Sequence, residues 1–146
     1  MSGITQRRDI GAFVKQVLGI APTTVVAGSG GDNVTQYGPE VVRSDIGGGL
    51  SATVALPAIY TVTDDLAVSA VVQHRASETA DWADYITIPA TTYTTDTAAT
   101  AIKLAGIDLS GALDRVRLGV TANFEASETD TITLAGVLTF EGGDEL

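Results

Sequence analysis

The sequence predicts an all-β domain, an antiparallel β-sandwich of jelly-roll type. From Leu50 onward, apolar residues alternate with small or polar residues, which is the two-residue period of half-buried strands. Turn-forming residues recur between these runs at short spacing, and β-branched residues are frequent. The chain has 146 residues and 45% apolar content, so it fits one domain whose core needs no disulfide bonds.

Six segments carry this alternation. The expected strands lie in residues 50–57, 66–75, 84–89, 100–107, 115–124 and 131–140. In the fifth segment Val116, Leu118 and Val120 point one way, while Arg115 and Arg117 point the other. Each strand is therefore expected to bury one face and expose the other.

The residues before Leu50 lack the two-residue alternation. We therefore divide the chain into an N-terminal arm (1–49) and a β-sandwich domain (50–146). Residues 9–18 have apolar side chains at helical spacing, with Asp9 as a cap, and predict one short helix. The stretch that follows contains "AGSGGDN" and "DIGGG". Because glycine-rich sequence interrupts regular structure, we expect an extended segment that runs over a surface.

The tetrapeptide ASET occurs twice, at residues 76–79 and 126–129. Each copy follows a long alternating run. Ser, Glu and Thr end strands and satisfy turn backbone groups with their side chains. We expect two similar hairpin ends, produced by turn chemistry rather than by duplication.

The composition excludes some classes of site and argues against binding to nucleic acid or spanning a membrane. The chain has no cysteine, so disulfides, thiolate metal sites and a cysteine nucleophile are excluded. The formal net charge of −10 opposes binding to nucleic acid, and no apolar run approaches the roughly 20 residues of a membrane helix. Paired arginines precede an apolar stretch near the N-terminus, but Lys15 interrupts it, so we expect no export signal.

No set of residues predicts a catalytic, cofactor or metal site. His74 is the only histidine, and the alternation makes it a half-buried packing residue near a strand end. The many carboxylates lie at strand ends, where turn roles are expected, and no spacing selects a catalytic pair. Oxygen ligands gather in "ETADWAD", which keeps a calcium site open as an alternative.

Interface residues are the candidates that remain. The N-terminal arginines give the arm a mild positive charge, which suits either a solvated segment or docking on an acidic partner. Trp and Tyr are enriched at protein interfaces, so we rank a contact role above a ligand platform for the aromatics. The candidates are Arg7, Arg8, Ile10, Phe13, Val17, Tyr37, Trp82 and Tyr85.

The stretch "IYTVTDDLAVSAVVQHRASETADWADYITIPATTYTT", followed by "DLSGALDRVRLGVTANF" and "TITLAGVLTF", resembles auxiliary virion proteins of tailed bacteriophages, in particular head decoration or cement proteins. The resemblance covers about two-thirds of the chain and identifies no individual functional residue. It implies a β-domain on the capsid exterior, made in the host cytoplasm, that clamps neighbouring coat subunits. The implied partners are the major capsid protein and further copies of the chain in a homotrimer.

Three other functions stay open. A tail or neck structural protein belongs to the same class. A secreted β-sandwich that binds carbohydrate or calcium would need exposed aromatics and an export signal. An enzyme ranks last, because no nucleophile, base and orienting group converge. The sequence thus favours a non-enzymatic structural protein without a cofactor.

Overall fold

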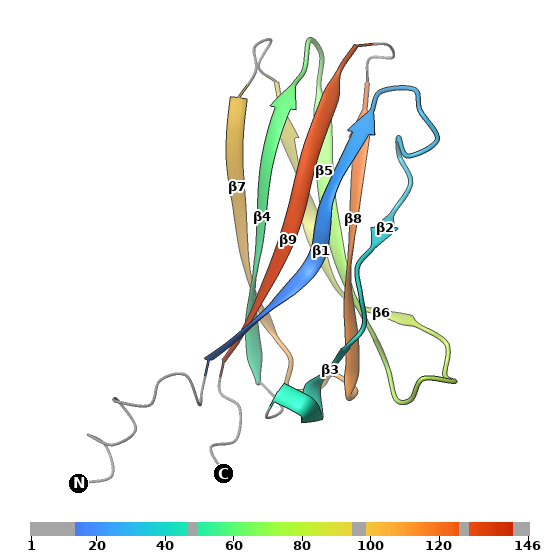
Figure 1. Cartoon of the computed structure of the whole chain (residues 1–146), viewed down its shortest axis with the longest axis vertical. Coiled ribbons are helices and arrows are strands. Elements are labelled where there is room, and N and C mark those ends of the chain that lie inside the picture. The colour runs from blue at the N-terminus through green and yellow to red at the C-terminus, as the bar shows by residue number, and fades with distance from the viewer. Residues whose placement is uncertain (1–13, 47–49, 95–98, 126–128, 142–146) are drawn as a thin grey trace, which may run out of the picture.

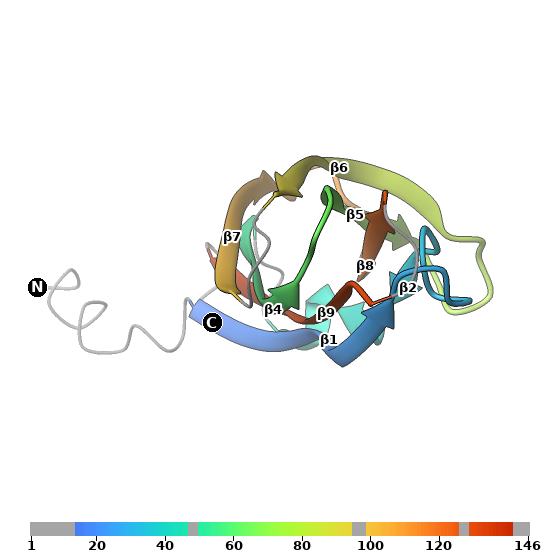
Figure 2. The same cartoon turned by 90° about the horizontal axis from the view of Figure 1, so that it is seen from above.

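The computed structural model describes residues 14–46, 50–94, 99–125 and 129–141. These residues form two antiparallel sheets that face each other, as Figures 1 and 2 show. The strands are β1 (Val14–Val26), β2 (Gln36–Tyr37), β3 (Val41–Val42), β4 (Ser51–Thr61), β5 (Leu66–Arg75), β6 (Ala83–Tyr93), β7 (Ala99–Asp108), β8 (Arg115–Phe124) and β9 (Thr131–Glu141). A short 3-10 helix, Arg43–Ile46, follows β3.

The strand order is that of a jelly roll. Sheet A has the order β1-β9-β4-β7, and sheet B has the order β2-β8-β5-β6, with β3 also paired to β8. If β2 and β3 count as one interrupted strand, the described part of the chain contains eight strands, four in each sheet. This is the arrangement of two Greek keys folded into a double sheet. The predicted all-β sandwich is confirmed.

The core lies between the sheets and follows from the two-residue period. Along β4 and β9, buried and more exposed residues alternate, because successive side chains point to opposite faces of a sheet. The largest fully buried apolar side chains come from both sheets and from the loop after β7: Phe140, Leu66, Leu109, Leu118, Ile132 and Leu138.

The sheets approach each other closely on the β1 side. A Cβ added at Gly38, between β2 and β3, would lie 1.6 Å from the carbonyl oxygen of Gly19 in β1. A Cβ at Gly136 would lie 2.5 Å from Leu118 Cδ2. Only residues without a side chain allow backbone and core to meet this closely. On the opposite side, the Lys103 ammonium of β7 donates to the carbonyl oxygen of Pro89 and to the Thr91 hydroxyl of β6.

The predicted helix is wrong where the structure describes it. Residues 14–18 belong to β1, which pairs with β9, and residues 9–13 lie outside the described residues. The register of β1 shifts between Leu18 and Ile20 and again between Ile20 and Thr23. Both shifts lie after Leu18, and the pairing of residues 14–18 is regular. The helical spacing arose because Val17 packs on the core while its neighbour Leu18 is an apolar residue on the outer face, 49% exposed.

The predicted arm needs a similar correction. Residues 14–46 contain β1, β2 and β3, which are paired in the two sheets, so the sandwich begins well before Leu50. The strands of residues 14–46 were not predicted, because β2 and β3 are too short to show a two-residue period and glycine-rich turns lie between the strands. Residues 1–13 lie outside the described residues.

The two ASET copies have different settings. The first forms the turn between β5 and β6, which pair as a hairpin. The second follows β8, and the chain then crosses to β9 in the other sheet, so the second hairpin end is wrong. Residues 126–128 lie outside the described residues. Because β5 and β8 are antiparallel neighbours, the strand ends that precede the two copies lie at opposite ends of the sandwich.

Candidate interaction surfaces

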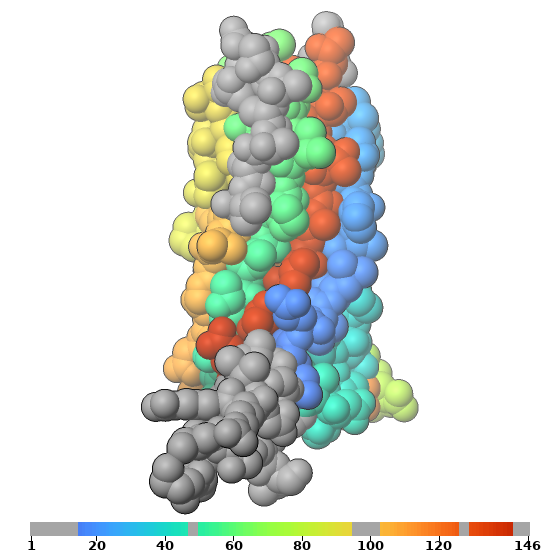
Figure 3. Space-filling model, turned by 60° about the vertical axis from the view of Figure 1, so that its left-hand side comes forward, coloured from blue at the N-terminus to red at the C-terminus, as the bar shows by residue number. Residues whose placement is uncertain are grey.

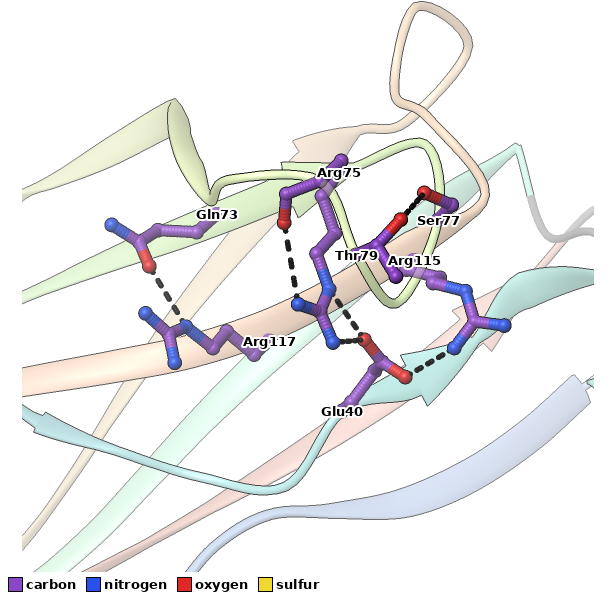
Figure 4. A network of polar contacts seen from close by, with 8 residues as sticks. Glu40, Gln73, Arg75, Ser77, Thr79, Arg115 and Arg117 are labelled. Atoms are coloured by element: carbon purple, nitrogen blue, oxygen red, sulfur yellow. Dashed lines mark hydrogen bonds and ion pairs between the residues drawn. The ribbon is translucent and has the colours of Figure 1, made fainter.

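A cluster of arginines lies on the outer face of sheet B. Arg75 of β5 stands opposite Arg115 of β8, and Gln73 stands opposite Arg117. Like charges on opposite strands destabilise a sheet unless a counter-charge intervenes. Glu40, between β2 and β3, supplies it by accepting hydrogen bonds from both Arg75 and Arg115 (Figure 4). We call this set, with Tyr37 and Trp82, the arginine cluster.

The carboxylate of Glu40 is held in its charged form. Partial desolvation acts in the opposite direction. The hydrogen bonds and charges of Arg75 and Arg115 outweigh it and lower the pKa of Glu40 below its ordinary value. Glu40 therefore attaches the β2–β3 segment to β8 and β5, the two central strands of sheet B, at the end where β8 begins and β5 ends.

Arg117 joins two aromatic rings that are far apart in the sequence. Its guanidinium carbon lies 3.9 Å from the centroid of the Tyr37 ring and 4.5 Å from that of the Trp82 ring. Its Nε donates to the Gln73 side-chain oxygen at 2.8 Å, and the Gln73 amide donates to Asp84 at 2.8 Å. These contacts fix the orientation of both rings without a hydrophobic core around them.

The cluster differs from the rest of the molecule in charge. It holds three of the eight Lys and Arg residues of a chain whose net charge is −10. Counted over the cluster and the neighbouring Asp84, three guanidinium groups stand beside two carboxylates, which leaves a slight positive excess. Tyr37 remains 44% exposed. The surface can thus offer a ring edge and guanidinium donors to acidic or acceptor-rich groups of a partner.

The same contacts weaken the carbohydrate alternative. Arg75 also lies 4.4 Å from the Trp82 centroid, so two guanidinium groups stack on that ring. A sugar platform requires an open aromatic face. Here guanidinium groups occupy ring surface on both Trp82 and Tyr37.

His74 has a structural role. Its ring lies 4.8 Å from that of Tyr85, and its Nδ1 accepts a hydrogen bond of 3.1 Å from the Leu113 amide. The Tyr85 hydroxyl donates to the carbonyl oxygen of Asp108 at 3.0 Å. These bonds hold the β7–β8 loop against sheet B. They agree with the packing role expected for His74.

Carboxylates at strand ends also serve the backbone. Asp130 is buried and accepts from Thr63 N, Thr63 Oγ1 and Asp64 N. Asp32 accepts from Gly28 N and Phe124 N. Within the described ranges, no group of three or more His, Cys, Asp or Glu residues could hold a metal ion. Nor does that part of the chain contain a helix long and apolar enough to cross a membrane.

The structure places the predicted interface residues in different settings. Arg7, Arg8, Ile10 and Phe13 lie outside the described residues. Val17 is partly buried and packs on the core from β1, and Tyr85 packs at the core edge. Tyr37 and Trp82 meet around Arg117. Their contact role stays a prediction.

Sequence reasoning missed Glu40, Arg75 and Arg117 as members of a surface site. One signal was present: Arg115 and Arg117 occupy alternate positions of a strand and so share its outer face. The pairing with Arg75 depends on strand register, which links residues 40 positions apart.

Comparison with known proteins supports the fold. No family model matches the chain, and no curated protein matches it. A chain of the T13 infectious bursal disease virus particle matches with TM-score 0.52 and 11% identity, over 90% of this chain and 32% of that chain. The Gx strain of the same virus gives TM-score 0.50 and 13% identity, over 90% and 33%.

A bacterial enzyme shares the fold to the same degree. The CBM22-1–GH10 modules of xylanase 10B from Clostridium thermocellum, complexed with xylohexaose, match with TM-score 0.50 and 14% identity, over 92% of this chain and 27% of that chain. The chain spans about a third or less of the length of these neighbours. At such low identity the likeness concerns the fold alone.

Proposed function

We propose that the chain is a non-enzymatic structural protein of a virion, of the decoration type, that binds the outer surface of a tailed-phage head and clamps coat subunits. The observation that carries the proposal is the jelly-roll fold, whose strand order is that of a double Greek key and which is similar to chains of infectious bursal disease virus particles. The resemblance of the sequence to phage auxiliary virion proteins supports the same class.

The arginine cluster is the surface that we assign to the coat protein. Trp, Tyr and Arg dominate the binding energy of protein interfaces, and the cluster presents all three in fixed positions. Its slight positive excess suits acidic or acceptor-rich groups on the coat subunits. Because the rest of the chain is acidic, this face would also orient the molecule during approach.

A carbohydrate-binding module is the second candidate. The fold shared with a xylanase complexed with xylohexaose favours it, as do the aromatic rings of the cluster. The guanidinium groups on those rings count against it. A binding assay with xylohexaose distinguishes the two functions: measurable affinity would favour the module.

The test is co-sedimentation of the purified protein with tailed-phage heads, followed by electron microscopy. Wild-type protein should sediment with the heads, and Arg117→Ala should weaken this by at least tenfold. Lys15→Ala is the matched control, because it removes one positive charge from an exposed position outside the cluster. The proposal would be wrong if Arg117→Ala bound the heads as tightly as Lys15→Ala does, or if the wild-type protein did not bind them.

A further inference from the structure

Among the described residues, the outer face of sheet A carries no charge except at one end. Four strands lie side by side on this face in Figure 3. We call it the neutral face, and its outward residues include Gln16, Leu18, Thr24, Thr53, Ala55, Pro57, Ile59, Leu104, Gly106, Thr133, Ala135, Val137 and Thr139. The carboxylates Asp108 and Glu141 lie only at one end, beside Ser51.

One apolar row crosses the whole face. Leu18 pairs with Val137, Val137 with Ala55, and Ala55 with Leu104. The two ends of the row are exposed, Leu18 by 49% and Leu104 by 67%, and Ile59 nearby is 61% exposed. Exposed large apolar side chains that line up across a sheet mark a contact surface more strongly than scattered ones.

The polar side chains of the face are partly satisfied within it. The Thr24 and Thr133 hydroxyls hydrogen-bond at 2.8 Å, and the Gln16 amide donates to Thr139 at 3.3 Å. Burying a polar group is costly when it loses its hydrogen bonds to water. Pairs that already bond to each other reduce this cost, so the face can be covered by an apolar partner.

We infer that the neutral face binds the neutral face of a second copy of this chain. Two molecules that each carry a net charge of −10 repel one another, and this repulsion is weakest between surfaces without charge. Four strands at about 4.8 Å spacing and about nine residues at about 3.4 Å rise give roughly 19 Å by 31 Å, or about 600 Å² per copy. Two copies would bury about 1,200 Å², near the lower end of the range for a specific interface.

A two-fold axis along the strands makes the face complementary to itself. The axis reverses the strand order, so Leu18 meets the partner subunit's Leu104, and Val137 meets the partner subunit's Ala55. A leucine then meets a leucine at both ends of the apolar row, and valine meets alanine in its middle. This contact closes at two copies, in place of the trimer that the sequence resemblance implies. It needs no capsid and does not depend on the proposed function.

Sedimentation velocity of the purified full chain tests the inference. With rising concentration the molar mass should approach twice the 15.0 kDa of a single chain. Leu104→Glu should keep the protein monomeric at every concentration. The control Leu113→Glu changes another exposed leucine, 44% exposed and in the β7–β8 loop, and should leave dimerisation intact. Circular dichroism should show the same β signal for both variants.

A charge pair tests the geometry. Leu18→Glu and Leu104→Lys should each abolish the dimer, and the double variant should restore it, because each new carboxylate would meet the partner's new ammonium at both ends. A wild type that stays monomeric, a stable trimer, a dimer that survives Leu104→Glu, or a double variant without rescue would overturn the inference.

Discussion

Among the glycines described, Gly38 is the one whose replacement by alanine should destabilise the fold most. The new Cβ would lie 1.6 Å from Gly19 O, 2.7 Å from Gly19 C and 3.1 Å from Ile20 Cα. All three atoms are backbone of β1, so no side-chain rotation relieves the clash. The β2–β3 segment or β1 must move, and the hydrogen bond of 2.8 Å from Gly38 N to Leu118 O would be strained or lost.

The cost follows from these contacts. Overpacking costs about 1–3 kcal/mol, and one lost hydrogen bond adds about 1 kcal/mol, so we expect a loss of about 2–4 kcal/mol. For a domain of this size the melting temperature should fall by about 5–15 °C. Urea unfolding followed by circular dichroism measures the free energy directly.

Gly106→Ala is the matched control. Gly106 lies within β7, and a Cβ added there meets nothing within 4 Å. The change should be neutral or stabilise by about 0.5–1 kcal/mol, because alanine restricts the unfolded chain. If Gly38→Ala unfolds at the same urea concentration as the wild type, the close approach of β1 and the β2–β3 segment is wrong.

Three further changes test other contacts. Asp130 is buried; burial alone would raise its pKa, but hydrogen bonds from Thr63 and Asp64 outweigh it and lower the pKa below the ordinary 3.8. The stabilisation that the Asp130 carboxylate provides is therefore complete above the ordinary pKa and is lost as the pH falls through the lowered value. Asp130→Asn should cost about 1–3 kcal/mol at neutral pH and make the free energy of unfolding less dependent on pH in the acid range. An unchanged dependence of the free energy of unfolding on pH would contradict this role. Glu40→Gln should leave Arg75 facing Arg115 and lower the urea midpoint, more at low salt than at high salt; a midpoint independent of salt would refute the bridging role. Lys103→Met should cost about 1 kcal/mol by removing the contacts between β7 and β6, and unchanged thermal unfolding would show that these contacts contribute nothing.

Much of the fold could be predicted from local patterns. The bounds of β5 and β8 coincide with their alternating runs, because β8 buries one face along its whole length and β5 does so from Leu66 to Val72. β1 could not be predicted in this way, since its bulges interrupt the alternation. β2 and β3 are too short to show a period.

The candidate surfaces depend on register, which a single sequence does not reveal. The outward orientation of Arg115 and Arg117 followed from the strand pattern, but their meeting with Glu40 and Trp82 depends on pairing between distant segments. The neutral face could not be predicted from the sequence either. Leu18 and Leu104 belong to a single row only because β9 and β4 lie between their strands.

Electron cryomicroscopy of particles purified from the source that encodes the chain tests the virion role most directly. If the chain is a decoration protein, it should sediment with the particles, and a density of this jelly roll should repeat on the outside of the shell, with the arginine cluster against coat subunits. Particles that lack the chain, with all of it recovered in the soluble fraction, would contradict a role in the virion.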